Sequence, residues 1–393
     1  MLQEVVIVSA ARTPIADFMG SLQNFSAIQL GTAALKESMA RARIEPDTVE
    51  EVLAGNCLQA GSPGNVARHI QMHSGIPAKS TAMTVNQQCP SSMRATEILS
   101  QQIMLGKIGA GAVVGTESMT NAPYLLLNAR KGYRLGPGDT ALDSMLHNGL
   151  VCGLSNGHMG ITAENVAQMY RISRQEQDEL ALMSNQRAMA AIREGRFKEE
   201  IFPIEISGKK GTVLFDTDEH PKDTSLETLG KLRPAFRKDG TVTAGNSSGI
   251  NDGAAAMVIM TAEKAKELGC RPIAKIKAVG YGGCHPSIMG MGPAPAVRDL
   301  MKRSGLKLSD FQLIELNEAF AGQYLGCEKE LGINREITNV NGSGCGLGHP
   351  VGATGCRIMV TLLHAMKKRG KTLGLATLCG GGGVSMATAL EMV

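Results

Sequence analysis

Cys89 occupies a position where a nucleophile could form. A predicted strand at residues 81–85 runs into Asn86-Gln87-Gln88-Cys89, and Pro90 then opens a helical pattern that continues to residue 105. Free N–H groups and the positive end of a helix dipole lower the pKa of a thiol at such a place. The spacing also fits a buried cysteine at a tight turn, and this feature alone leaves both interpretations open.

A glycine-rich loop leads to His349. Between positions 341 and 355, seven of fifteen residues are glycine or proline, too many for a regular helix or strand. The loop lacks the GK[ST] ending of a phosphate-binding loop. It better fits a loop that lets a flat ligand approach the backbone and that holds His349 rigidly before Pro350. A structural turn with a solvated histidine is the alternative.

A second cysteine, Cys379, precedes four consecutive glycines at 380–383. The glycines separate two strand-like segments, 373–378 and 384–391. Backbone N–H groups exposed in such a turn can stabilise negative charge on a reacting carbonyl oxygen. A plain hairpin turn that needs positive φ angles would have the same sequence.

Asn317 and Glu318 follow the apolar run 311–314, and this pattern predicts a strand-to-helix junction. An asparagine at a helix start usually caps the helix. The functional alternative is a polar group that orients a water molecule or a histidine.

The elements that must position these residues alternate between strands and helices, which is typical of an α/β fold. The middle of the chain, roughly 120–249, is rich in charge and turns and predicts an insertion lying over a core. Its helical segments are 162–170 and 174–194. Elsewhere, helix is expected at 27–42 and strands at 5–10, 51–54, 112–114, 256–260 and 273–279.

A loose internal repeat links the two regions that carry Cys89 and His349. Val85-Asn86 precedes a polar turn, Cys89 and a helix, whereas Val340-Asn341 precedes the glycine-rich turn, His349 and a helix starting near Val351. Each helix is followed by an apolar strand. Two related α/β halves with facing active loops would explain this pattern.

Composition argues against several classes of protein. The chain has 393 residues, a net charge of +4, 3% aromatic residues and no tryptophan, which disfavours nucleic-acid binding. Nine cysteines cannot all pair, and no CxxC supports a metal site. No apolar run approaches the ~18 residues of a membrane span, and the N-terminus lacks the basic start of a signal peptide. We therefore expect a cytoplasmic protein of two or three domains, or of one large duplicated unit, whose charge is compatible with an anionic small molecule.

Together these features resemble the thiolase family, and the resemblance covers essentially the whole chain. The matching motifs, in chain order, are at 8–14, 86–89, 115–119, 158–160, 231–236, 245–253, 289–293, 317–320, 348–355 and 379–381.

The resemblance implies a fold of two similar α/β halves, each a mostly parallel five-stranded sheet, stacked around shared central helices in α-β-α-β-α layers. It divides the chain into an N-terminal half (1–119 plus 250–273), an inserted loop domain (120–249) and a C-terminal half (274–393). The family forms dimers and often tetramers, through the loop segment around residues 124–145. A homotetramer is therefore expected.

The resemblance also assigns roles to the residues singled out above. Cys89 would be the nucleophile, with His349 accepting its proton, and Cys379 would remove a proton from a second substrate. The backbone N–H groups of Cys89 and Gly381 would form one oxyanion hole. His349, with a water molecule positioned by Asn317, would form the other.

Coenzyme A contacts are carried over from the family as well. The residues implied are Leu150, His158, Met159, Lys222, Phe236, Ala244, Gly245, Ser248, Ala319 and Phe320, the last two lining the acyl pocket. Two departures concern the active loops: Pro90 stands where relatives often have Ala or Gly, and residues 343–346 differ from the commoner Gly-Ala-Ile-Ala. Pro90 lacks an N–H of its own, but the oxyanion hole needs the N–H of Cys89, so we expect the hole to survive. The difference at 343–346 concerns the detailed pocket shape and not the chemistry. A third, Lys222 for a frequent Arg, keeps the charge but loses planar stacking.

The activity implied is that of an acetyl-CoA acetyltransferase, which joins two acetyl-CoA into acetoacetyl-CoA and CoA through an acyl-Cys89 intermediate, without metal or other cofactor. A 3-ketoacyl-CoA thiolase of wider chain-length range is one alternative. A ketoacyl synthase is another, although Cys379-Gly-Gly speaks against it, because a base is needed only when no CO₂ leaves. A non-enzymatic relative would be expected to lose Cys89 or His349, and both are present.

Overall fold

The first half of the central sheet is built by strands that flank the predicted nucleophile. The computed structural model describes residues 2–155, 157–208 and 211–393. β3 (Glu51–Gly55) runs parallel to β4 (Thr81–Val85) and to β5 (Ala110–Ser118). β12 (Asn251–Thr261) is antiparallel to β5 and to β1 (Val5–Arg12), and it also pairs with β2 (Ala16–Asp17).

The second half repeats this order. β14 (Leu313–Leu316) runs parallel to β15 (Leu373–Cys379), and β16 (Val384–Met392) is antiparallel to β15 and to β13 (Ala274–Gly283). Thr338 bridges to Ile314 in parallel, at the place that β4 takes beside β3. The structure thus supports the repeat predicted from Val85-Asn86 and Val340-Asn341.

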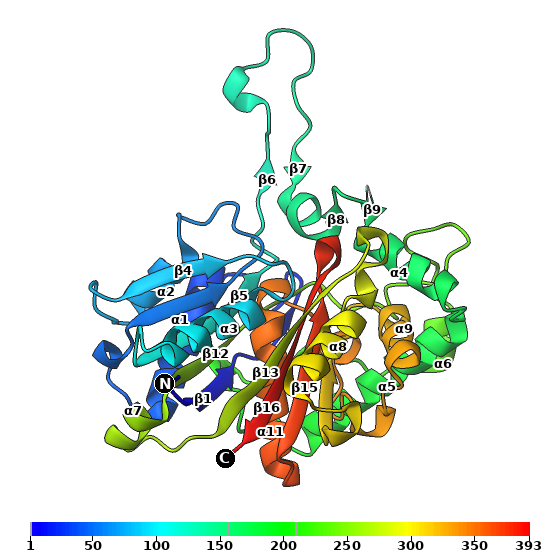
Figure 1. The fold of residues 1–393 in the computed structure, drawn as a ribbon. Coiled ribbons are helices and arrows are strands. Elements are labelled where there is room, and N and C mark those ends of the chain that lie inside the picture. Colours follow the sequence, from blue (N-terminus) through cyan, green and yellow to red (C-terminus); the bar gives the residue numbers. More distant parts are fainter. Residues whose placement is uncertain (1, 156, 209–210) are drawn as a thin grey trace.

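The two halves join edge to edge through β1 and β13, where Val6 pairs with Lys275 and Ile7 with Ala274. Among the described residues this gives one continuous ten-stranded sheet (Figure 1). The α/β class of the prediction is confirmed. The parallel pairs lie in the outer part of each half, however, and the central pairs are antiparallel. β15 and β16 can pair in this way because a short turn, and no crossover helix, joins them.

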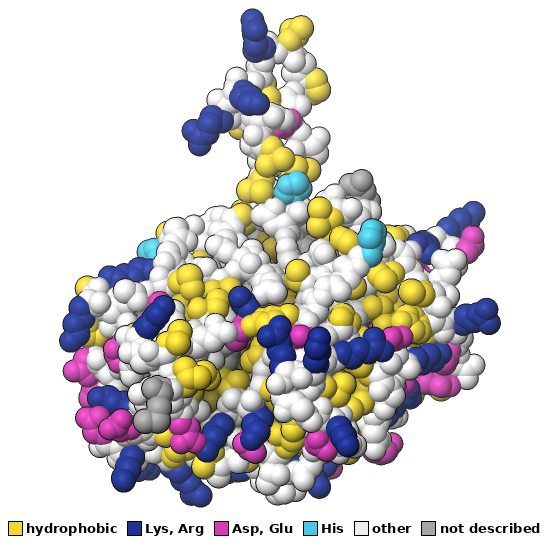
Figure 2. Space-filling view, viewed as in Figure 1, with side chains coloured by type: hydrophobic (Ala, Val, Ile, Leu, Met, Phe, Trp, Pro, Cys, Tyr) yellow, Lys and Arg dark blue, Asp and Glu magenta, His cyan; other side chains and the backbone are white. Residues whose placement is uncertain are grey.

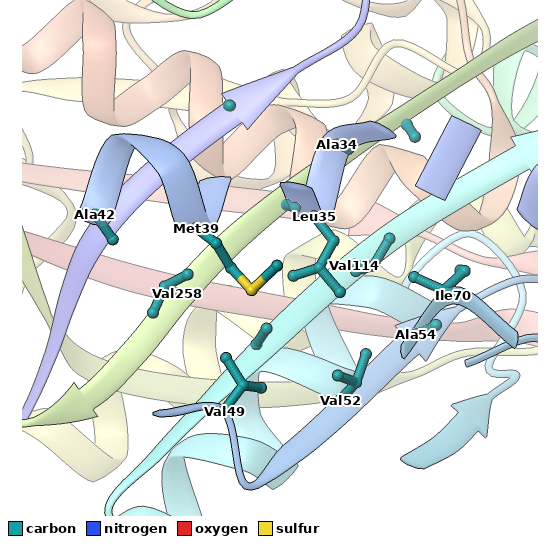
Figure 3. Close-up of a cluster of buried hydrophobic side chains, with 14 of the residues drawn as sticks. Ala34, Leu35, Met39, Ala42, Val49, Val52, Ala54, Ile70, Val114 and Val258 are labelled. Carbon is teal, nitrogen blue, oxygen red and sulfur yellow. The ribbon is translucent and has the colours of Figure 1, made fainter. Parts of the chain in front are cut away.

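Helices cover both faces of each half. Two central helices, α3 (Ser91–Met104) and α11 (Thr354–Arg369), share one hydrophobic cluster with strands of both halves. On the outer face of the first half, α1 (Ala27–Ala42) and α2 (Val66–His73) pack onto the sheet through Leu35, Met39 and Ile70 (Figure 3). On the outer face of the second lie α8 (Pro293–Ser304) and α9 (Ala321–Leu331). Outer helices, the first half of the sheet, the central helices, the second half of the sheet and further outer helices thus form the predicted α-β-α-β-α layers.

Local sequence explains where the helices begin. Ser26 and Ser173 each form a capping box, which starts α1 at Ala27 and α5 (Arg174–Arg193) at Arg174. α4 (Met159–Met169) begins three residues before the predicted start, because the His158 ring accepts a hydrogen bond from the Gly160 N–H and caps the helix. α4 and α5 both pack on the second half of the sheet.

The middle of the chain also forms an arm that stands out from the body (Figure 1). β6 (Tyr124–Leu125) and β7 (Leu142–Asp143) pair at its base, and Figure 2 shows basic and hydrophobic side chains along it. No helix in the described part of the chain is long and apolar enough to cross a membrane. The three-part domain division stays a prediction. The remaining short elements are β8 (Val151–Cys152), β9 (Gly157–His158), β10 (Ile204–Gly208), β11 (Gly211–Phe215), α6 (Leu226–Gly230), α7 (Ala262–Glu267) and α10 (Gly344–Leu347).

Candidate active site

Cys89 lies in a tight turn between β4 and α3. The preceding residue, Gln88, has a φ of 58°, in the left-handed region that non-glycine residues seldom adopt. The turn is held by Ser91, whose hydroxyl donates to the Gln88 carbonyl oxygen and accepts from the Gln87 N–H. Pro90 is the N-cap, so Cys89 stands one residue before it. The backbone next to Cys89 is therefore held in an unfavourable conformation, as is common at functional sites.

The expected lowering of the Cys89 pKa is wrong. The residue keeps some exposed surface, but its thiol is desolvated, and desolvation raises the pKa of Cys89 to about 12. Hydrogen bonds from the backbone N–H groups of Gly381 and of Cys89 itself act in the opposite direction without reversing the shift. These are the two groups predicted to form an oxyanion hole, and both reach the sulfur of Cys89.

His349 faces Cys89 from the glycine-rich loop. Its Nε2 lies 3.3 Å from Cys89 Sγ. On the other side of the ring, Nδ1 lies 2.7 Å from the Thr354 hydroxyl oxygen, and that hydroxyl donates to the Pro350 carbonyl at 2.9 Å. Because the hydroxyl proton is already used, Nδ1 carries the ring proton and Nε2 is free to accept one from the thiol.

The imidazole is held in its neutral form. Burial, and then the positive charge of Arg357, lower the pKa of His349 to about 3. Its backbone N–H donates to Asn251 Oδ1 at 2.8 Å, which fixes the loop. A neutral thiol and a neutral base therefore face each other in the resting protein.

Cys379 ends β15 and is fully buried. Burial, and then the proximity of Cys89, raise the pKa of its thiol. It belongs to an apolar cluster with Met159, Ala319 and Phe320, against which Phe236 packs. Beside this cluster a pocket of about 490 Å³ opens to the surface, lined in part by Gln88, Met159 and Gly381.

Asn317 does not cap a helix. α9 begins at Ala321 and its N-cap is Phe320, so Asn317 lies in the connection after β14. Its side chain is fully buried, with Nδ2 3.4 Å from Nδ1 of His349. The geometry rejects the capping interpretation and brings Asn317 to the predicted histidine.

The structure brings together five of the residues predicted to contact coenzyme A. The ring of Phe236 stacks on His158 with centroids 4.7 Å apart and meets Phe320 edge-on at 6.2 Å. Met159, Ala319, Phe320 and Phe236 form the wall around Cys379, and His158 joins this wall through its stack on Phe236. Leu150 packs in a neighbouring cluster that includes Cys89.

The other four lie outside this wall. The Ser248 N–H donates to the Ala319 carbonyl, Gly245 approaches Leu229 and Leu232, and Ala244 is exposed. The exposed Lys222 places its Nζ 4.0 Å from the Asp17 carboxylate instead. For all ten residues the contact with coenzyme A stays a prediction.

One supporting residue went unassigned in the sequence although its motif was noticed. Glu117 is fully buried and accepts hydrogen bonds from the Asn56 side chain and from the N–H groups of Cys57, Leu58 and Gly352. Burial raises the pKa of this carboxyl to about 7. Its anchoring of Gly352 fixes the loop that follows His349. The sequence signal that could have pointed to Glu117 is a carboxylate near the end of a mostly apolar strand.

Comparison with known proteins decides the family. The model of the thiolase N-terminal domain matches residues 5–263, and that of the thiolase C-terminal domain matches residues 270–392. The chain belongs to the thiolase family. This thiolase is 50% identical over 392 residues to the acetyl-CoA acetyltransferase of Escherichia coli K12, covering 99% of both chains.

Solved structures agree. The acetyl-CoA acetyltransferase of Syntrophomonas wolfei matches with a TM-score of 0.98 and 46% identity over 100% of both chains. Human mitochondrial 3-ketoacyl-CoA thiolase matches with a TM-score of 0.97 and 40% identity over 100% of this thiolase and 99% of that chain. As a member of this family, the protein is an acyltransferase.

Proposed function

We propose that this thiolase catalyses the reversible condensation of two acetyl-CoA into acetoacetyl-CoA and CoA. The observation that carries the proposal is the 3.3 Å contact between Cys89 Sγ and His349 Nε2, beside the cluster that contains Cys379. The names of relatives such as the Escherichia coli acetyl-CoA acetyltransferase support this choice of substrate.

In the first half-reaction, Cys89 gives its proton to Nε2 of His349 and its sulfur attacks the acetyl carbonyl carbon. A sulfur–carbon bond forms on Cys89 while the thioester bond to CoA breaks. The N–H groups of Cys89 and Gly381 hold the tetrahedral oxygen. CoA leaves as a thiolate and then takes a proton from the buried Cys379, a thiol at rest because its pKa is raised, so that Cys379 becomes the thiolate.

In the second half-reaction, the Cys379 thiolate takes a proton from the α-carbon of a second acetyl-CoA. Protonated His349 and a water molecule on Asn317 hold the enolate oxygen. The carbanion attacks the acetyl carbon, a carbon–carbon bond forms, and the bond to Cys89 breaks. Cys89 recovers its proton from His349, so all three groups return to their starting states. The cycle balances without a metal or other cofactor.

The wall around Cys379 suits the pantetheine and acyl end of the substrate. His158, Met159, Phe236, Ala319 and Phe320 supply apolar surface, and Leu150 extends it towards Cys89. We assign Lys222, Ala244, Gly245 and Ser248 to the rest of the coenzyme A path, as the family resemblance suggests.

We also propose a homotetramer that works in the cytoplasm. The arm exposes large apolar side chains, with Leu135 99% and Leu127 55% exposed, which is a costly surface for an isolated chain. Contact between arms of two copies would bury it. Nine free cysteines fit a reducing compartment. Light scattering of the purified protein tests the assembly.

A thiolase of wider chain-length range is the second candidate, favoured by the 40% identity to human mitochondrial 3-ketoacyl-CoA thiolase. One assay separates the two. The enolate absorbance of 3-ketoacyl-CoA substrates of increasing length is followed after CoA is added. Activity confined to acetoacetyl-CoA supports our proposal, activity that rises with length supports the second candidate, and inactivity with all substrates rejects both.

A further inference from the structure

Arg357 places a fully buried cation directly behind the candidate active site. It lies in the first turn of α11 and is 1% exposed. Its Nη2 donates to Asn317 Oδ1 at 3.4 Å, and its Nη1 lies 3.9 Å from Glu315 Oε2 on β14. Its Nε and Nη1 make no hydrogen bond within the described residues. Burying an incompletely paired guanidinium is costly, so a role in the site is worth seeking.

The guanidinium determines which way the Asn317 amide faces. Arginine has only donors, so the amide oxygen must turn towards it and the Nδ2 group must turn towards His349. Thr354 already occupies Nδ1 of His349 at 2.7 Å, closer than the 3.4 Å of Asn317 Nδ2. The Asn317 N–H is therefore left available for another acceptor.

The positive charge of Arg357 is not cancelled where it meets the site. Burial raises the pKa of Glu315, the nearest acid, to about 8, and its Oε2 lies 3.9 Å from Nη1 of Arg357, beyond hydrogen-bond distance. The neighbouring charges are committed elsewhere. Arg12 pairs with Glu200 and Asp218, and Glu318 accepts from Ser184 and Asn339. The field of Arg357 consequently reaches His349, where, after burial, it contributes to lowering the pKa of the imidazole.

We propose that Arg357 is a positioning residue for the carbon–carbon bond step: it fixes the amide of Asn317 and adds a positive field where the enolate oxygen forms. The inference rests on the function proposed above. Acetylation of Cys89 depends less on Asn317, so the two half-reactions respond differently to a change at position 357.

The experiment compares Arg357→Met and Arg357→Lys with His364→Gln, a control on the same helix whose ring contacts the Ala10 carbonyl instead. Acetylation of Cys89 is measured by mass spectrometry, condensation by CoA release, and folding by circular dichroism. For Arg357→Met we expect the rate of condensation to fall roughly 10²-fold, because a small displacement of the Asn317 amide can cost that much. The loss of Cys89 acetylation should be smaller. Arg357→Lys should lie between, and His364→Gln near the wild type.

Two further readouts separate positioning from mere support of the fold. Without the cation the pKa of His349 rises, although burial still keeps it below its ordinary value, so the acid side of the pH–rate profile moves to higher pH. In a double-mutant cycle, Arg357→Met should cost less once Asn317 is already Ala, because the part of its effect that acts through the amide is then already lost. If Arg357→Met does not fold, Arg357→Lys enters the cycle instead.

Equal losses in both half-reactions, or additive losses in the cycle, overturn the inference. A wild-type protein that neither acetylates Cys89 nor condenses acetyl-CoA would reject the proposed function itself, and that result is read before any variant is made.

Discussion

Cys89 Sγ and His349 Nε2 lie 3.3 Å apart although 260 positions separate the two residues in the chain. Burial raises the pKa of the thiol to about 12 and lowers that of the imidazole to about 3. The resting pair is therefore neutral. We therefore expect the proton to move only when a substrate carbonyl arrives for the sulfur to attack.

Alkylation of Cys89 by iodoacetamide tests this neutral pair. Because the thiolate is the reactive form, the rate should rise about tenfold per pH unit from pH 7 to 10 without levelling off. A small free thiol, with a pKa of about 8.5, is the control and should level off within that range. A plateau for Cys89 below pH 8 would mean that a thiolate exists at rest.

The two catalytic cysteines should divide the reaction between them. With acetyl-CoA alone, the wild type should gain one acetyl group on Cys89 by mass spectrometry. Cys379→Ser should still be acetylated, since CoA can leave as a thiolate, but its turnover should fall about 10²-fold or more without the acid–base group. Cys89→Ser should not be acetylated. Equal loss of acetylation in both variants would contradict this division.

Asn317→Asp should fold normally and lose carbon–carbon bond chemistry. The substitution puts a negative charge beside the developing oxyanion and removes an N–H donor, and such a donor is worth roughly 10²–10³ in rate. Acetylation of Cys89 should weaken less. His349→Ala, in contrast, should slow both half-reactions. The rate of each half-reaction in folded Asn317→Asp protein is the measurement, and near-wild-type condensation would deny Asn317 this role.

Gly160→Ala should weaken substrate binding. A Cβ at Gly160 would lie 2.3 Å from the Phe236 ring, so the ring must leave its stack on His158. Overpacking of this kind costs roughly 1–3 kcal/mol, which would raise KM for acetyl-CoA by about tenfold if the binding wall takes it up. Gly230→Ala is the matched control, because a Cβ there meets no atom within 4 Å. An unchanged KM for Gly160→Ala would mean that the substrate does not bind against the stacked rings of Phe236 and His158.

Much of the fold could be predicted from the sequence because local patterns determine it. The helix at 27–42 and the strand at 81–85 have the predicted bounds, since a capping box and a run of strand-forming residues mark them. The edge joint between β1 and β13 was not predicted. The pairing of β1 with β13 rests on two residue pairs between segments far apart in the chain, and no local sequence pattern indicates it.

The site divides in the same way. The motifs brought Cys89, His349, Cys379 and Asn317 into consideration, and the structure brings them to one place. The direction of the Cys89 pKa shift was mispredicted, because desolvation is a property of the packed protein and not of the helix start. Arg357 was missed for a similar reason. In the sequence it is one cation on an apolar helix, and only the fold places it against Asn317.

The continuous sheet has a consequence for how this thiolase is made. During synthesis, Cys89 leaves the ribosome on the growing chain long before His349, Cys379 and β16 have been made. β13 needs β16 on one side and β1 on the other to complete the sheet. We therefore expect Cys89 to stay an unreactive thiol in the growing chain, and a chain that stops before residue 384, which lacks β16, not to turn over acetyl-CoA.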